Sequence, residues 1–380
     1  MTETRIRYSG EMNEREARIK VIGVGGGGGN AVNRMVEADV RRVEFVALNT
    51  DAQDLRRSKA SNRIQIGENL TRGLGVGGDP SRGRQAALES VDIIKETVAD
   101  SELLFITAGM GGGTGTGGAP VVAQVAKENT GALVIGVVTK PFEFEGGVRA
   151  SQAQDGIREL RKYVDCLLVI PNQRMLEIVD RSTPANEAYR MADDVLRQAI
   201  QGISDLITKA GDINVDFEDV RKIMTKSGEA LIGIGRASGP SRHTDAAAKA
   251  INSPMLESAV IDGAKGLLVN FTSSRNVKLI EISEAMDYIM KSVNPDVFMK
   301  YGQAYDDEMG DELKITVIAT GFPAKQNDFM SDLSRRPRGK TRDYGSDDFF
   351  AVPEQSPAQS AEDMEKPAFL RRKASSKRLN

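Results

Sequence analysis

Residues 111–117 read GGGTGTG and carry almost no side chain apart from two threonine hydroxyls. They follow an apolar run at 103–106 and precede another at 121–126, which predicts a turn between a buried strand and a helix. Such a turn lets backbone N–H groups approach an anion, and the helix N-terminus adds partial positive charge. A flexible linker is the alternative, but linkers are usually serine-rich and do not join a buried strand to a helix. The segment therefore predicts a phosphate-binding loop.

Two further glycine-rich segments share this setting. Residues 23–30, GVGGGGGN, follow a strand-like run and open a helix at 31–36, and residues 73–80, GLGVGGDP, precede another helix. The first matches the fingerprint G-x-G-x-x-G, and Asp51, about 20 residues further on, could hold a ribose, so an NAD-dependent oxidoreductase stays open. Three glycine loops instead favour a nucleoside triphosphate. The P-loop lysine pattern is absent, so helix N-termini, a bound cation and Arg149 would neutralise the phosphates.

Composition narrows the class of protein. The 380 residues include one histidine and one cysteine, which argues against a histidine-based triad, a multi-histidine metal site and a disulfide framework. No apolar run reaches the roughly 18 residues that span a bilayer, and no signal peptide is evident, so a cytoplasmic location is expected. From Ser331 onward there are 11 basic and 8 acidic residues, which leaves a net charge of about −6 on the preceding part. A negative body argues against nucleic-acid binding.

The apolar pattern predicts the elements that position these loops. Strand-like runs at 19–23, 43–48, 63–66, 103–107, 133–138 and 166–170 alternate with helical segments, which indicates an α/β domain with a parallel sheet. Ligands collect at the carboxyl ends of such strands, where the glycine loops fall. A broad apolar stripe over 184–207 predicts a long helix between two domains. The part that follows is α+β, with strands expected at 231–237, 266–271, 277–281 and 314–320 and helices at 245–251 and 283–293.

Two charged segments have local explanations as well as functional ones. In 214–221, NVDFEDVR, Asp216 is a natural helix N-cap and Asp219 nearly completes a capping box. Glu145 and Arg149, four residues apart, are usually a solvated ion pair. From their own residues alone, neither segment requires a functional role.

The motifs GVGGGGGN, NTD at 49–51, GGGTGTG and NVDFEDVR, in this order, resemble the FtsZ family of bacterial tubulin-like cell-division GTPases. The resemblance covers about 18–322 and resumes at the C-terminal tip. It implies a tubulin-like GTPase domain with a parallel sheet, a long central helix, a smaller α+β domain and a disordered tail. The implied parts are a disordered N-terminal extension (1–17), the GTP-binding domain (18–183), the connecting helix (184–210), the C-terminal domain (211–322), a disordered linker (323–361) and a partner-binding peptide (362–380).

The family resemblance also assigns roles to single residues. The residues that would cradle the phosphates are Gly26, Gly27, Gly28, Gly29, Asn30, Gly111, Gly112, Gly113, Thr114, Gly115, Thr116 and Gly117, with Gly77 and Gly78 near the γ-phosphate. The residues that would contact the sugar or the guanine are Asn49, Glu145, Arg149, Asn172 and Asp194. The residues that match the catalytic synergy loop (214–219) are Asn214, Asp216 and Asp219. That loop would enter the nucleotide site of the next subunit, where the carboxylates position the attacking water.

The implied function is GTP-dependent self-assembly into head-to-tail protofilaments at the midcell division site, with GTP hydrolysed to GDP and phosphate between subunits. Mg²⁺ is the implied cation, and the sequence indicates no ligands for it. Membrane contact would be indirect, through division proteins that bind Pro367, Phe369, Leu370 and Arg371, although a solvated tail explains this segment equally well. A nucleotide-bound scaffold that does not hydrolyse GTP is the alternative function.

Overall fold

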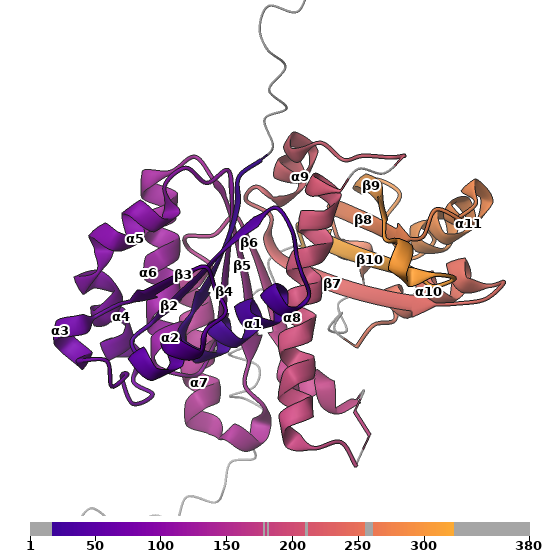
Figure 1. Cartoon of the computed structure of the whole chain (residues 1–380). Coiled ribbons are helices and arrows are strands. Elements are labelled where there is room, and N and C mark those ends of the chain that lie inside the picture. The colour runs from indigo at the N-terminus through magenta and orange to yellow at the C-terminus, as the bar shows by residue number, and fades with distance from the viewer. Residues whose placement is uncertain (1–16, 178, 181, 210–211, 255–260, 323–380) are drawn as a thin grey trace, which may run out of the picture. The chain divides into compact units, whose positions relative to one another are not determined.

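The computed structural model describes residues 17–322, apart from 178, 181, 210–211 and 255–260 (Figure 1). The expected linker (323–361), the terminal peptide (362–380) and all of the N-terminal extension except Ala17 lie outside the described residues. The structure therefore does not describe the four residues expected to bind partner proteins, Pro367, Phe369, Leu370 and Arg371.

A ten-stranded sheet runs through the described part of the chain in the order β3-β2-β1-β4-β5-β6-β7-β10-β8-β9. Neighbours from β3 to β7 are parallel, β10 is antiparallel to both β7 and β8, and β9 is parallel to β8. The expected parallel sheet in the first half is confirmed. The strands are β1 (Ile19–Val24), β2 (Val43–Asn49), β3 (Asn62–Gln65), β4 (Leu103–Gly109), β5 (Leu133–Lys140), β6 (Cys166–Pro171), β7 (Gly228–Ala237), β8 (Gly266–Ser273), β9 (Phe298–Tyr305) and β10 (Leu313–Thr320).

Both faces of β1, β4 and β5 are buried, which explains their continuous apolar sequences. Val21 and Ile22 are consecutive in β1, yet they belong to two different hydrophobic clusters because their side chains point to opposite faces. The helices are α1 (Gly25–Glu37), α2 (Ala52–Arg57), α3 (Glu68–Thr71), α4 (Pro80–Glu89), α5 (Val91–Val98), α6 (Thr114–Asn129), α7 (Gly147–Leu160), α8 (Ala185–Thr208), α9 (Phe217–Met224), α10 (Arg242–Ile251) and α11 (Leu279–Met290). Short 3-10 helices are η1 (Glu143–Glu145), η2 (Asn172–Glu177), η3 (Ile261–Gly263) and η4 (Asp307–Met309).

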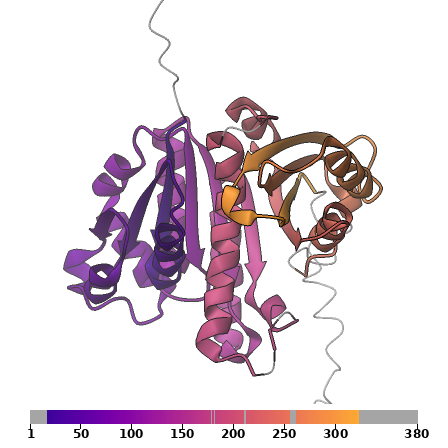
Figure 2. The same cartoon turned by 45° about the vertical axis from the view of Figure 1, so that its right-hand side comes forward.

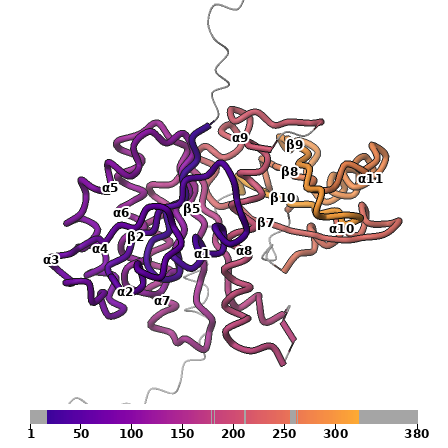
Figure 3. The backbone as a smooth tube through the Cα atoms, viewed as in Figure 1, coloured from indigo at the N-terminus to yellow at the C-terminus, as the bar shows by residue number. Residues whose placement is uncertain are grey.

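The long helix expected at 184–207 is α8, which lies between the N-terminal and C-terminal strands (Figures 1 and 2). It contacts α1, β5 and β6 on one side and β8 and β9 on the other. Its buried residues Leu196 and Ile203 belong to one hydrophobic cluster with Leu168 of β6 and Leu268 of β8. One core thus continues from the first half of the sheet to the second, and the path of the chain from α8 through α9 to β7 is visible in Figure 3.

Two expectations for the C-terminal part were wrong. The strand expected at 277–281 is instead the start of α11, because the Glu281 carboxylate accepts a hydrogen bond from the Lys278 N–H (2.8 Å) and so closes the first turn. Strand β9 was not expected at all. Its residues, FMKYGQAY, alternate in burial only weakly and include no continuous apolar run.

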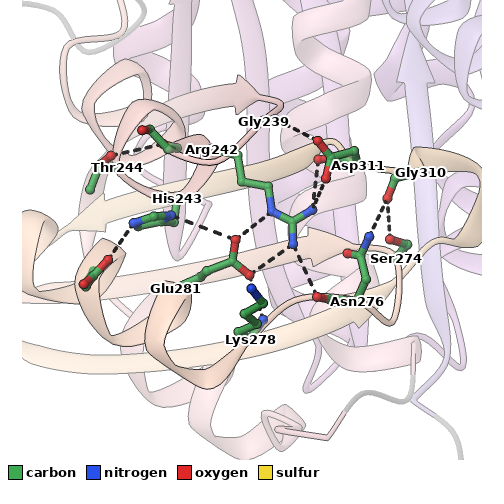
Figure 4. Close-up of polar contacts among 12 residues, drawn as sticks. Gly239, Arg242, His243, Thr244, Ser274, Asn276, Lys278, Glu281, Gly310 and Asp311 are labelled. Carbon is green, nitrogen blue, oxygen red and sulfur yellow. Dashed lines mark hydrogen bonds and ion pairs between the residues drawn. The ribbon is translucent and has the colours of Figure 1, made fainter.

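A buried arginine ties the C-terminal elements together (Figure 4). Arg242, at the start of α10, donates from Nε and Nη2 to the two carboxylate oxygens of Glu281 in α11, at 2.9 and 3.1 Å. Its Nη1 reaches both the carboxylate and the backbone carbonyl of Asp311, each at 3.0 Å, in the loop before β10. The hydrogen bond from Arg242 holds the pKa of Glu281 below its ordinary value. Arg242 therefore joins α10, α11 and the loop between β9 and β10.

We predict that Arg242→Met lowers the free energy of unfolding by about 3–5 kcal/mol, because Glu281 would stay buried without its cation. Chemical denaturation measures the loss. Arg158→Met is the matched control, because Arg158 pairs with Asp155 on an exposed helix face and its removal should leave the unfolding midpoint almost unchanged. Equal midpoints for the two variants would contradict the prediction.

Candidate functional site

The first glycine run lies inside a helix rather than before one. Helix α1 begins at Gly25, directly after β1, so Gly25–Gly29 form its first turns and not, as expected, a loop that ends at residue 30. Gly25 has a φ of +71°, and a Cβ there would lie 2.8 Å from the backbone nitrogen of Gly115. Glycine at this position therefore lets the start of α1 approach the start of α6, with the free N–H groups of both first turns close together.

The GGGTGTG segment divides between a turn and a helix. Gly111–Gly113 form the turn after β4, and α6 begins at Thr114. The Gly111 N–H donates to the Thr116 hydroxyl (2.8 Å), which fixes the turn against the helix. The hydroxyl of Thr114 lies 2.7 Å from that of Thr50, just after β2. A Cβ on Gly112 would meet nothing within 4 Å, so the turn presents open backbone there.

The third glycine segment leads into α4. Asp79 caps this helix by accepting from the Ser81 N–H (2.8 Å), and Gly77 and Gly78, both with positive φ, face open space. A Cβ on Gly117 would overlap the Pro80 carbonyl, so α4 and α6 are in contact where both begin. The N-termini of α1, α4 and α6 therefore converge, which is a favourable arrangement for a polyphosphate.

These helix starts surround a cleft of about 310 Å³ at the carboxyl ends of β1, β2 and β4. A volume of this order suits a nucleotide-sized ligand. The residues that line it are Val24, Gly26, Gly27, Asn49, Thr50, Asp51, Asp54, Leu74, Gly75, Val76, Gly77, Gly78, Gly109, Gly112, Gly113, Thr114 and Gly115. Six predicted phosphate contacts are absent from this lining. Gly28, Gly29 and Asn30 lie further along α1, and the other three are Gly111, Thr116 and Gly117.

The acidic side chains of the cleft are already engaged. Asp51 caps α2 through its Oδ1, which accepts from the N–H groups of Gln53 (2.8 Å) and Asp54 (3.3 Å). This use as a helix cap argues against the ribose role that a dinucleotide fingerprint would give Asp51. Asn49 donates to Asp54 (2.7 Å), whose pKa is raised by burial and by the charge of Asp51.

Glu145 and Arg149 form an ion pair beside the cleft. Glu145 also accepts from the Phe142 N–H (2.9 Å), and a Cβ on Gly111 would lie 2.9 Å from the Arg149 carbonyl, so this pair lies next to the GGGTGTG turn. Asn172 follows β6 and is buried, and its side-chain carbonyl has no hydrogen-bond partner among the described residues. An acceptor in that state suits an N–H donor of a ligand.

Asp193, which the sequence analysis did not single out, precedes the expected Asp194. Asp194 accepts from Arg197 and Gln198, both at 2.6 Å; burial alone would raise its pKa, but these hydrogen bonds lower it overall. Burial raises the pKa of Asp193 to about 7, although the charge of Arg34 in α1 opposes the shift. Asp193 thus faces α1, one helical turn beyond Tyr189, whose ring meets Phe142 edge-on (5.2 Å between centroids).

The synergy-loop residues lie at the opposite edge of the sheet. Asp216 is the N-cap residue of α9, but its side chain makes no capping hydrogen bond, so the capping explanation fails for this residue. Asn214 and Asp216 line a second hollow, of about 480 Å³, together with Ala17, Arg42 and Glu102. Ala17, Arg42 and Glu102 lie just before β1, β2 and β4, whereas the cleft lies at the other ends of the same three strands. Across strands of this length the two sets are separated by roughly 20 Å.

Two family comparisons cover most of the chain. The GTPase domain of the Tubulin/FtsZ family matches residues 18–180, and the C-terminal domain of the FtsZ family matches residues 228–323. Among solved structures, an FtsZ dimer from M. jannaschii is 42% identical, with a TM-score of 0.78 over 81% of this chain and 89% of that one. An FtsZ mutant from the same organism is 43% identical, with a TM-score of 0.77 over 81% and 92% of the two chains.

A more distant relative shows the fold alone. CetZ2 from Haloferax volcanii, solved as a GTPγS-bound protofilament, is 22% identical, with a TM-score of 0.70 over 84% of this chain and 97% of that one. Within the described residues, no group of three or more His, Cys, Asp or Glu side chains is arranged to hold a metal ion. None of the helices described is long and apolar enough to cross a membrane.

We predict that Gly112→Ala weakens guanine-nucleotide binding roughly ten-fold or more, because the added methyl group would enter the cleft without disturbing the fold. Fluorescence titration with a labelled nucleotide measures the Kd. Gly131→Ala is the control, since its Cβ also meets nothing within 4 Å but lies outside the cleft. Unchanged affinity in Gly112→Ala would mean that the phosphates bind elsewhere.

Proposed function

The chain belongs to the FtsZ family of tubulin-like GTPases, and on that premise we propose that it hydrolyses GTP at a site completed by a second copy of itself. The observation that carries the proposal is the separation of the two half-sites. The phosphate cleft opens after the parallel strands, and Asp216 lies beyond their other ends. One subunit cannot bring these groups together, but two subunits stacked head to tail can.

The proposed chemistry divides between the two copies. The N-termini of α1, α4 and α6 would hold the phosphates and stabilise the negative charge that develops on them. Asp216 and Asp219 of the adjoining subunit would orient a water in line with the γ-phosphorus and accept its proton, while Asn214 would contribute a polar contact to that water. A heterologous contact of this kind does not close on itself, so it produces a filament.

Mg²⁺ fits this cleft without a dedicated cage of side chains. Asp51 and Asp54 are the carboxylates that line it, and both already serve local hydrogen bonds. Mg²⁺ commonly keeps several waters and binds through one or two carboxylates and substrate phosphates. When bound, the ion would neutralise phosphate charge that no lysine in the cleft lining offsets.

For the cell, we propose assembly into a division ring at midcell, tethered by the peptide at 362–380 to membrane-anchored division proteins. We also propose to divide the folded part of the chain into residues 18–183, 184–210 and 211–322. A nucleotide-bound scaffold that assembles without hydrolysis is the second candidate. The Asp216 side chain makes no capping hydrogen bond, so its carboxylate is left for catalysis. This favours the GTPase, because a scaffold needs no such acid.

We predict a threshold protein concentration for phosphate release from GTP. Below it, release should be negligible, and above it, release should rise linearly together with light scattering, because only assembled subunits have a complete site. Asp219→Asn should bind GTP and scatter light but hydrolyse GTP about 10²–10⁴-fold more slowly.

Three results would contradict parts of this proposal. Phosphate release strictly proportional to concentration from zero, without scattering, would mean that each monomer hydrolyses alone. Wild-type turnover by Asp219→Asn would remove the shared site. Scattering without any phosphate release from the wild-type protein would support the scaffold.

A further inference from the structure

Strand β9 contacts the synergy loop and α9 along its whole length. The Gln303 N–H donates to the Ile213 carbonyl (2.9 Å), and the Tyr305 hydroxyl bonds to the Asp212 carboxylate. A Cβ on Gly302 would lie 2.9 Å from the side chain of Val215, so glycine there permits the close approach of the loop. The segment that carries the acids thus rests on a strand much later in the sequence.

Two side-chain contacts continue this arrangement into α9. The Asp219 carboxylate pairs with the Lys300 ammonium at 3.0 Å, and the Lys222 ammonium lies over the Phe298 ring, 4.4 Å from its centre. Asp219 and Lys222 are three residues apart and share one face of the helix. Phe298 and Lys300 are two residues apart and share one face of the strand. Helix and strand therefore meet through two matched pairs.

The first of these pairs restrains a carboxylate of the proposed catalytic machinery. Lys300 holds Oδ2 of Asp219, and the Asp219 side chain remains 29% exposed, so it can still reach an outside group. The described residues give Asp219 no second ion pair. Without Lys300 the short side chain would be free to rotate among its rotamers.

We propose that Lys300 is a positioning residue for GTP hydrolysis, which fixes the Asp219 carboxylate in the orientation that serves the neighbouring subunit. This inference rests on the proposed function. Lys300 would act through Asp219 and would touch neither the nucleotide nor the attacking water. Since both side chains are partly exposed, at 38% and 29%, the pair contributes little to the stability of the fold.

The test compares Lys300→Met with Lys300→Arg above the assembly threshold. Lys300→Met should lower kcat roughly 3- to 10-fold, with KM for GTP, the amount of sedimented polymer and the thermal unfolding midpoint near wild type. Lys300→Arg keeps the cation and should restore most of kcat. Lys222→Met is the matched control, because it removes the neighbouring lysine, which pairs with Phe298 instead of Asp219, and should leave kcat unchanged.

A double-mutant cycle separates this inference from the proposed function. Lys300→Met combined with Asp219→Asn should be no slower than Asp219→Asn alone, because Lys300 acts only through Asp219. Additive losses, or wild-type kcat in Lys300→Met, would overturn the positioning role while the shared site stands. A faster Lys300→Met would also overturn it, since the pair would then restrain Asp219 in an inactive orientation. Wild-type turnover by Asp219→Asn would instead remove the proposed function itself.

Discussion

The nucleotide cleft depends on how closely three helices begin beside one another. At Gly25 and Gly117, a single Cβ would collide with the backbone of a neighbouring helix start and push the helices apart. The anion-binding capacity of a helix N-terminus lies in its first turn and declines over a few ångströms. Separating the helix starts would therefore disperse the N–H groups that replace a lysine in this cleft. The glycines determine the electrostatics of the site because they let the helix starts come close together, and not because they supply a charged group.

The parallel strands decide at which edge of the sheet each set of loops lies. Every parallel strand ends at the same edge of the sheet, so the loops that follow β1, β2 and β4 gather at the cleft, and the segments that precede them gather at the other edge. The chain reaches that other edge only because α8 is long enough to return there before α9 begins. In the proposed mechanism, the two incomplete half-sites at opposite edges make each subunit polar, so subunits with complementary ends would add in one direction.

The sequence predicted most elements whose residues are buried on both sides, because continuous apolar runs leave few alternatives. It failed where exposure and packing decide. Leu279 and Ile280 suggested a strand, yet they are exposed on the first turn of α11. The glycine-rich turns at the cleft were predictable, because glycine is informative there without any knowledge of a partner.

Strand β9 is the most consequential omission, because the segment that carries Asp216 and Asp219 rests on it. Its polar residues gave no strand signal, yet they hold residues 212–219 through backbone and side-chain contacts. The loop after β9 is in turn fixed by Asp311, which Arg242 binds. A connected series of contacts therefore leads from Arg242 through β9 to Asp219. A rearrangement that shifts β9 would therefore also shift the Asp219 carboxylate, so in the proposed mechanism the C-terminal domain would take part in hydrolysis.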